Sequence, residues 1–155
     1  MKKDIIISVD IGGTTFNSGI FTDSLNQVAI SEKDKIRFYK SKNDVVNAIV
    51  KQVNNLIDSV NISKTDILGL GVGAPGPLDP KKGVILDTPN LRIFKNYHIT
   101  YDLTKKLRID TFIENDANLF ALGEWLLSYK KNDVVLGITL GTGLGFGLVF
   151  NGQSF

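Results

Sequence analysis

The residues Phe112-Ile113-Glu114-Asn115-Asp116-Ala117-Asn118 join a short β-branched and aromatic run to a long apolar helical pattern. They predict a strand that ends where a helix begins. In open α/β sheets this junction lies at the carboxyl ends of the strands, where ligands bind. Asp116 could take a proton from a substrate hydroxyl there, and Asn115 could orient that hydroxyl. Asp and Asn are also favoured helix N-caps, so a purely structural interpretation stays open.

The composition of the 155 residues is that of an ordinary globular protein, with 43% hydrophobic and 22% charged residues. The net charge is only +2 and the lysines are scattered, so neither a nucleic acid nor a membrane is expected as a partner. Cysteine is absent, which excludes disulfides and cysteine-ligated metal within this chain. His98, the single histidine, is expected to be solvated rather than to bind a metal.

One uncharged stretch, from Val134 to Phe150, is close to the lower length limit of a membrane-spanning helix. Glycine, however, occupies every second position at 141, 143, 145 and 147. A period of two is typical of strands and turns, and each glycine weakens a helix by about 1 kcal/mol. The stretch is therefore interpreted as β structure, and a cytoplasmic location is expected.

The apolar pattern predicts an α/β fold with a mixed sheet, antiparallel at one edge and parallel in the centre. Strands are expected at 5–9, 16–21, 28–38, 67–74 and 111–115, helices at 43–59, 101–107 and 116–130, and a hairpin at 134–139 and 144–150. Ser41 and Asp44 resemble a capping box, and a loop is expected from Pro75 to about Tyr97.

Two glycines outside the turns carry separate predictions. Gly19, inside the second expected strand, indicates a bulge or a close approach of another group to the backbone. The helix at 116–130 is apolar on two faces, so we expect it to be buried, with Gly123 allowing a neighbour to come close.

Eleven of the 15 glycines, Gly19 among them, lie in three clusters at strand ends or turns, which suggests that the backbone must come close to another group there. In Asp10-Ile11-Gly12-Gly13-Thr14-Thr15, backbone N–H groups and two hydroxyls could form a concave anion site, and Asp10 could hold a metal-bound water. The alternative is an ordinary hairpin in which Gly-Gly supplies positive φ. The motif is not a P-loop, because the Gly-Lys-Ser/Thr ending and the following helix are missing.

The last cluster, Leu140-Gly141-Thr142-Gly143-Leu144-Gly145-Phe146-Gly147, repeats this chemistry. Two threonine-bearing glycine hairpins could hold a polyphosphate from two sides. Each alone is a weak signal. An early Asp-Gly-Gly-Thr hairpin, an Asn-Asp strand end and a late Gly-Thr-Gly hairpin, in that order, form a much stronger one.

In this combination the chain resembles the ROK (repressor, open reading frame, kinase) family of the sugar kinase, actin and heat-shock-chaperone ATPase superfamily. The matching motifs are Val9–Thr14, Gly71–Asp79, Pro89–Leu91, Glu114–Asn118 and Leu140–Gly145. The resemblance implies a ribonuclease-H-like, actin-type ATPase lobe over residues 1–115, with a mixed five-stranded sheet flanked by helices. Residues 116–155 would be the connecting helix and first hairpin of a second lobe.

The resemblance implies ATP-dependent phosphorylation of a hexose, with Asp116 as the catalytic base. Asn115, Gly76 and Asn90 would bind the sugar. Mg²⁺ would be bound through water by Asp10. The ATP phosphates would lie on the two glycine hairpins, at Asp10, Gly12, Gly13, Thr14, Thr15, Gly141, Thr142, Gly143 and Gly145.

Some features depart from the family pattern. Phe146 stands where many relatives have glycine, and Thr15 where lysine is frequent. Family members are about twice as long, so the rest of the sugar site, the zinc cluster and most of the adenosine pocket would lie beyond Phe155. We therefore expect a fragment that is inactive alone, whose unpaired strand edges favour a homodimer.

Two alternatives have weaker support. A sugar-sensing transcriptional regulator of the same family would need a helix-turn-helix before the first strand, and the strand already begins by Ile5. A non-catalytic, actin-like nucleotide-binding module would share only the phosphate hairpins, and the Gly-Ala-Pro-Gly-Pro turn and Pro89-Asn90 argue against it.

Overall fold

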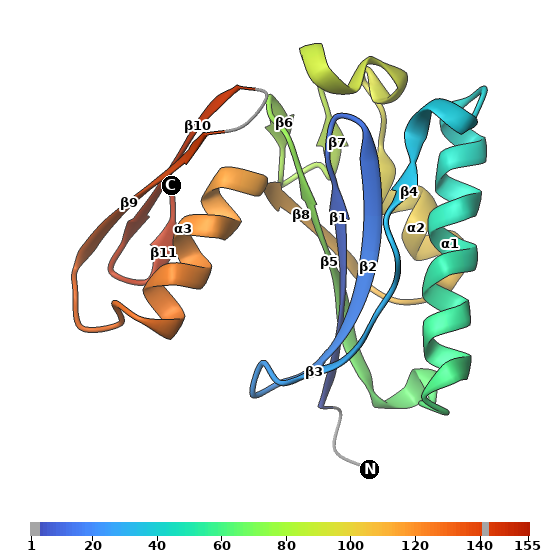
Figure 1. Ribbon diagram of the computed structural model, residues 1–155, viewed down its shortest axis with the longest axis horizontal. Helices are drawn as coiled ribbons and strands as arrows, with labels where there is room; N and C mark the ends of the chain where they lie inside the picture. Colours follow the sequence, from blue (N-terminus) through green and yellow to red (C-terminus); the bar gives the residue numbers. More distant parts are fainter. Residues whose placement is uncertain (1–3, 141–142) are drawn as a thin grey trace. The chain divides into compact units, whose positions relative to one another are not determined.

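The structure, a computed structural model, describes residues 4–140 and 143–155. The chain divides into two compact units, residues 1–113 and 114–155, and each is described by itself. Figure 1 shows the helices and strands of both. Within the described residues, no helix has both the length and the apolar character needed to cross a membrane.

The first unit is built on a mixed sheet with the strand order β3-β2-β1-β5-β8. These strands are β1 (Ile5–Ile11), β2 (Thr15–Thr22), β3 (Gln27–Ile30), β5 (Ile67–Ala74) and β8 (Thr111–Asn115). β1 is antiparallel to β2 and parallel to β5, so the prediction of an antiparallel edge and a parallel centre is confirmed. A short sixth strand, β4 (Asp34–Lys35), also pairs with β2.

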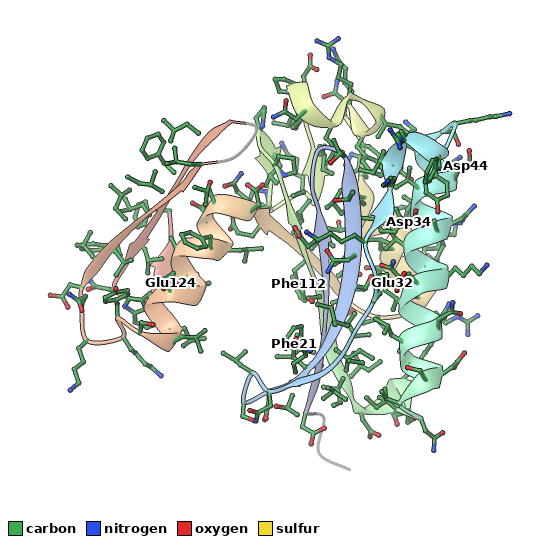
Figure 2. The ribbon with its side chains drawn as sticks, in the orientation of Figure 1. Phe21, Glu32, Asp34, Asp44, Phe112 and Glu124 are labelled. Carbon is green, nitrogen blue, oxygen red and sulfur yellow. The ribbon has the colours of Figure 1, made fainter. Side chains whose placement is uncertain are left out.

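The core of this unit lies between the sheet and two helices, α1 (Lys42–Ser59) and α2 (Ile99–Leu107), on one face (Figure 1). Alternate residues of β1 are buried there, namely Ile5, Ile7, Val9 and Ile11. The predicted capping box of α1 is confirmed. The Ser41 hydroxyl accepts the Asp44 N–H at 3.2 Å, and the Asp44 carboxylate accepts the Ser41 N–H at 3.0 Å; Figure 2 labels Asp44 at the start of the helix.

The prediction of one strand over 28–38 is wrong. The chain forms β3, breaks, resumes as β4 and turns into the 3-10 helix η1 (Ile36–Phe38). The break lies where a side chain enters the ladder: the Ser31 hydroxyl accepts the N–H of Ser18, 13 residues away, at 2.9 Å in place of a backbone acceptor. β3 therefore lies opposite Gly19–Phe21, whereas β4 lies opposite Thr15 and Phe16.

The loop predicted from Pro75 to Tyr97 contains regular structure, so that prediction is wrong in part. Leu78–Asp79 (β6) and Val84–Ile85 (β7) form a small hairpin, and Pro89–Phe94 form the 3-10 helix η3. Another 3-10 helix, η2 (Lys64–Asp66), precedes β5. α2 begins two residues before its predicted start. His98 directly before it is exposed, as expected.

Gly19 is confirmed as a point of close approach. A Cβ there would lie 2.7 Å from the Phe21 ring and 3.1 Å from the Ser8 hydroxyl, and the β2–β3 register shifts between Ile20 and Phe21. Figure 2 labels Phe21 near the end of this strand.

The second unit packs one helix on a small antiparallel sheet. The helix is α3 (Asp116–Leu127), and the sheet has the order β11-β10-β9, with β9 (Val134–Leu140), β10 (Leu144–Phe150) and β11 (Gln153–Ser154). The predicted hairpin is confirmed, with Leu140 opposite Leu144 and Val134 opposite Phe150. The helix ends at Leu127, three residues earlier than predicted.

α3 is not buried on both faces, which corrects the prediction. Its buried side chains are Ala117 and Ala121, whereas Phe120 is 44% exposed and Leu127 is 74% exposed. Among the described residues, nothing lies within 4 Å of a Cβ added at Gly123, so the predicted close neighbour is not found there. The buried residues are small because the hairpin backbone lies directly against the helix at Ala117 and Ala121, while the rings of Phe120 and Trp125 lie near Gly137 and Gly152.

The hairpin of this unit also carries an exposed apolar face. One set of alternate residues, which includes Gly137, Gly147 and Val149, is buried. The other set points to solvent and consists of Val134, Leu136, Ile138, Leu140, Leu144, Phe146, Leu148 and Phe150. Eight adjacent apolar side chains form a patch rather than isolated exposed residues, and apolar patches of this kind mark interaction sites.

Candidate active site

The tip of the β1–β2 hairpin carries the first group of predicted site residues. The Gly12 N–H donates to the Thr15 carbonyl at 2.8 Å, which closes the turn. Neither Gly12 nor Gly13 has positive φ; among the described glycines that conformation occurs at Gly83 and Gly152. The ordinary explanation of a Gly-Gly hairpin therefore does not apply to this turn.

Gly13 is instead required by a close neighbour. A Cβ at this position would lie 3.0 Å from the Asn90 carbonyl oxygen and 3.2 Å from the Asn90 Cβ. Asn90 belongs to η3, which is anchored by the buried side chains of Leu91 and Phe94. The structure thus brings together two segments that are far apart in the sequence, the candidate phosphate hairpin and the candidate sugar residue Asn90.

The turn that contains Gly76 is tied to the same segment. The Thr88 hydroxyl, which is buried, donates to the Pro77 carbonyl at 3.1 Å, and the Leu86 N–H donates to the same carbonyl at 3.0 Å. Thr88 therefore connects the Pro75–Pro77 turn to the chain that leads into Asn90. The sequence pattern did not single out Thr88, because its partner is a backbone carbonyl 11 residues away.

Asp10 is exposed near the end of β1. In the sheet it lies opposite Asn17 on β2 and opposite Gly73 on β5. Residues that lie opposite each other present their side chains on the same face of a sheet. The β5 residue opposite Asp10, Gly73, has no side chain. A single carboxylate of this kind suits Mg²⁺, which usually keeps several waters and binds one or two carboxylates plus phosphate.

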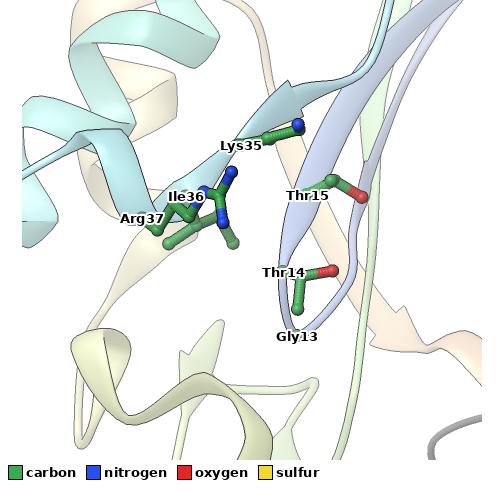
Figure 3. A pocket seen from close by; sticks show the side chains of 6 residues that line it. All are labelled: Gly13, Thr14, Thr15, Lys35, Ile36 and Arg37. Carbon is green, nitrogen blue, oxygen red and sulfur yellow. The ribbon is translucent and has the colours of Figure 1, made fainter.

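A pocket of about 390 Å³ opens beside the hairpin tip (Figure 3). It is lined by Gly13, Thr14, Thr15, Lys35, Ile36 and Arg37. Two of its residues, Lys35 and Arg37, were missed from the sequence, because they fall in a segment predicted to be a plain strand. The β2–β4 register, which places Lys35 opposite Thr15, is what brings them to the hairpin.

In the second unit, Asn115 and Asp116 begin α3 as predicted. The Asn115 side-chain oxygen accepts the N–H groups of Ala117 and Asn118 at 3.0 and 3.3 Å, so Asn115 is the N-cap. One oxygen of the exposed Asp116 carboxylate accepts the Ala117 N–H at 2.8 Å. Asn115 therefore has a structural role as the N-cap. That role uses only its side-chain oxygen, so its amide NH₂ group can donate to another acceptor.

Glu114 stabilises the same helix start. Its Oε1 accepts the Asn115 N–H at 2.8 Å and the Asn118 side-chain amide at 3.2 Å, while the Ser154 hydroxyl donates to Oε2 at 3.4 Å. Three residues around Asp116 are therefore held by hydrogen bonds to one carboxylate, which orders the first turn of α3.

The second glycine hairpin packs against this turn. A Cβ on Gly147 would lie 2.0 Å from the Ala117 carbonyl oxygen, and one on Gly145 would lie 3.2 Å from the Ala117 Cβ. Helix packing therefore accounts for glycine at 147, whereas at 145 an added Cβ would first meet the Thr139 hydroxyl on the neighbouring strand. Gly143 has open space around it, and Gly141 and Thr142 lie outside the described residues. The predicted contacts of this hairpin with phosphate stay a prediction.

Comparison with known proteins identifies several that are similar to this chain. The model of the ROK family matches residues 6–155. The chain is 33% identical over 153 residues to a glucokinase from Thermotoga maritima, covering 98% of this chain and 46% of that protein. It is 36% identical over 148 residues to an N-acetyl-D-glucosamine kinase from Photobacterium profundum, covering 94% of this chain and 46% of the relative.

A solved structure of a ROK family protein is also similar to this chain. A ROK family glucokinase from Streptomyces griseus, in complex with glucose and AMPPNP, is similar with a TM-score of 0.82 and 27% identity over 97% of this chain and 46% of that chain. The fold is that of the ROK sugar kinases, the actin-like ATPase fold, and the chain spans about half the length of the curated relatives it matches. Because the family model extends over nearly all of its residues, this chain belongs to the ROK family.

Proposed function

We propose that this chain provides the phosphate hairpin, the sugar-binding turn and the catalytic carboxylate of an ATP-dependent hexose kinase. The observation that carries the proposal is the packing of Gly13 against Asn90, which joins a candidate phosphate site to a candidate sugar site within the first unit. The curated relatives named above are sugar kinases, which supports the same reaction.

Asp116 is the proposed catalytic base. Phosphoryl transfer is catalysed mainly by positioning and by neutralising charge, so the base has only to orient the attacking hydroxyl and accept its proton. One carboxylate oxygen of Asp116 is engaged by the Ala117 N–H, and the second would face the hydroxyl. The helix N-terminus favours the anionic carboxylate.

Asn115 is the proposed partner of the same hydroxyl. Its oxygen caps α3, so the amide NH₂ group would donate to a lone pair of the hydroxyl while Asp116 accepts the proton. Gly76 and Asn90 would contact the rest of the sugar ring. The names of the relatives favour glucose or N-acetylglucosamine as the hexose.

The hairpin at Gly12, Gly13, Thr14 and Thr15 would donate to the ATP phosphates, with Gly141, Thr142, Gly143 and Gly145 as the second set of contacts. Mg²⁺ would be held by the phosphates and, through water, by Asp10. When bound, the ion would neutralise charge on the transferred phosphoryl group. This chain has no cysteine, so a cysteine-ligated zinc cluster would have to come from other residues.

A homodimer and a cytoplasmic location belong to the same proposal. The exposed apolar face of β9 and β10 is an observation that favours association, because eight apolar side chains lie on one surface. ATP as the phosphoryl donor favours the cytoplasm. The chain covers about half of its relatives, so we expect little or no turnover from these residues alone.

The test is a kinase assay of the natural protein with ATP and a panel of hexoses, in which Asp116→Asn is compared with Asp58→Asn. Asp58 is an exposed aspartate of α1, so its substitution makes the same chemical change at a distant site. We expect Asp116→Asn to lower kcat by at least about 100-fold, the lower range for general-base catalysis, and Asp58→Asn to have no effect. Turnover of Asp116→Asn within a few-fold of the parent would refute the assignment.

A further inference from the structure

The pocket beside the hairpin tip is lined by hydrogen-bond donors. Its polar side chains are the Lys35 ammonium, the Arg37 guanidinium and the hydroxyls of Thr14 and Thr15. Ile36 and Gly13 complete the lining, and none of the described residues that line it is a carboxylate. The backbone N–H groups of the glycine turn add further donors. A site of this composition suits a ligand that has only acceptor atoms and carries negative charge.

The two cations are not neutralised by nearby acids. Neither Lys35 nor Arg37 forms a salt bridge with any residue that the structure describes. Asp34 is the nearest acid in the sequence, but its two oxygens accept the Lys35 backbone N–H at 2.7 Å and the Tyr39 hydroxyl at 2.5 Å. Among the described residues, no carboxylate is paired with either cation, and the Arg37 guanidinium lies over the Phe38 ring at 5.4 Å from its centroid.

The segment that carries the cations is fixed before any ligand arrives. The Ile36 N–H donates to the Thr14 carbonyl at 2.9 Å, and the Ile36 side chain is buried between the two cations. The ring of Tyr39 packs on Phe16 with 6.1 Å between centroids. Figure 3 shows Lys35, Ile36 and Arg37 on this segment, next to the hairpin tip that carries Thr14 and Thr15. Preorganisation of this kind lowers the entropy lost on binding.

We propose that Lys35 and Arg37, together with Gly13, Thr14 and Thr15, bind linked phosphate groups, and that the natural occupant is the phosphate chain of a nucleoside triphosphate. Arginine matches phosphate with paired N–H groups, and lysine acts as a point charge. The inference rests on the proposed function, because it names the residues that bind the phosphoryl donor. It places two strong cations where the sequence pattern identified only hydroxyls and backbone amides.

The experiment is a titration of the ¹⁵N-labelled chain with inorganic tripolyphosphate, followed by NMR. We expect the amide signals of Gly13, Thr14, Thr15, Lys35 and Arg37 to shift. The double variant Lys35→Gln/Arg37→Gln should raise the Kd by about tenfold or more, since two charge-assisted contacts are lost. The charge-retaining variant Lys35→Arg/Arg37→Lys should keep most of the affinity, which separates lost charge from altered folding.

The matched control is Lys33→Gln/Lys40→Gln, which removes the same charge from exposed residues on the same segment outside the pocket. Its Kd should stay within about twofold of the parent, because exposed charges at a distance are screened. An equal loss of affinity in both double variants would overturn the proposal, as would shifts confined to other residues. ATP should shift the same signals, and adenosine should not; equal shifts with adenosine would also overturn it.

The result is independent of the kinase assay. Tripolyphosphate binding needs neither a hexose nor Asp116, so Asp116→Asn should bind it as the parent does. Phosphate binding that depends on Lys35 and Arg37, in a protein that phosphorylates no sugar, would refute the kinase proposal alone. Sugar phosphorylation with unchanged phosphate affinity in the Lys35→Gln/Arg37→Gln variant would refute this inference alone.

Discussion

Replacing Gly147 by alanine should disrupt the helix start that carries the proposed catalytic base. The new Cβ would lie 2.0 Å from the Ala117 carbonyl oxygen, 2.5 Å from the Ala117 carbonyl carbon and 2.8 Å from the Asn118 nitrogen. All three atoms are backbone, so no side-chain rotation relieves the clash. The first turn of α3 must then move by about 1 Å to restore an ordinary contact of carbon with oxygen.

Two effects of different size follow. Overpacking of this kind costs about 1–3 kcal/mol, and a clash with backbone belongs at the upper end, so we expect the free energy of unfolding of the second unit to fall by about 3 kcal/mol. A displacement of about 1 Å at a catalytic group can cost about 100-fold in rate. In the natural protein, Gly147→Ala should therefore lower kcat far more than the stability loss alone explains, because Asp116 lies in the displaced turn.

The assay is urea unfolding followed by the fluorescence of Trp125, the single tryptophan of the chain, which lies in the second unit. The control is Gly123→Ala in the same unit, where an added Cβ meets nothing within 4 Å. In a helix this change should stabilise by about 1 kcal/mol. Equal unfolding free energies for the two variants would refute the packing argument, and the glycine at 147 would then need another explanation.

Three further predictions concern the first unit. Ser41→Ala removes the cap of α1 and should lower the unfolding free energy by about 1 kcal/mol in a denaturant titration, whereas Ser59→Ala at the other end should change it less. Gly13→Ala forces the Asn90 backbone away from the hairpin and should raise the KM for the sugar several-fold; Gly71→Ala, which has open space, should not. The hydrogen bond to Asp34 raises the pKa of Tyr39 to about 12. Because the folded pKa lies above the unfolded value of 10.0, this contribution to stability is complete below pH 10 and is lost as the pH rises toward 12. Tyr39→Phe should weaken that loss in alkaline unfolding followed by circular dichroism, and an unchanged profile would contradict the assignment.

Local signals in the sequence were enough to predict much of the fold. The run of β-branched residues in β1 and the Ser41–Asp44 pair each specify an element through contacts with near neighbours, and both predictions are confirmed. The family resemblance was carried by five short motifs and is confirmed over residues 6–155.

The errors have non-local causes. The strand predicted over 28–38 is broken by a hydrogen bond between Ser18 and Ser31, which are 13 residues apart. The hydrophobic pattern of α3 could not show that its two fully buried residues are alanines, because the partner of that face is a glycine hairpin further along the chain. Residue type alone does not predict which apolar side chains pack against another element and become buried.

The candidate site was predicted unevenly for the same reason. Gly13 and Asn90 were each identified from their motifs, but their contact depends on how η3 packs. Lys35 and Arg37 carry no motif of their own, and only the pairing of β4 with the start of β2 reveals them. The family pattern described above implies that lysine is frequent at the position of Thr15, and the residue opposite Thr15 across the ladder is Lys35. A cation on the neighbouring strand would thus supply the charge that the hairpin itself lacks.

The proposed chemistry is divided between the two units. The groups proposed to donate to phosphate lie on the hairpin and β4 segment of the first unit, whereas the carboxylate that would accept the proton lies at the start of α3 in the second. Because phosphate binding and proton transfer then depend on separate residues, their variants should separate in kinetics. Loss of Lys35 and Arg37 should act mainly on the KM for ATP, and loss of Asp116 mainly on kcat. A variant at Lys35 that lowered kcat as strongly as Asp116→Asn, with an unchanged KM, would show that the cations act in the transition state rather than in binding.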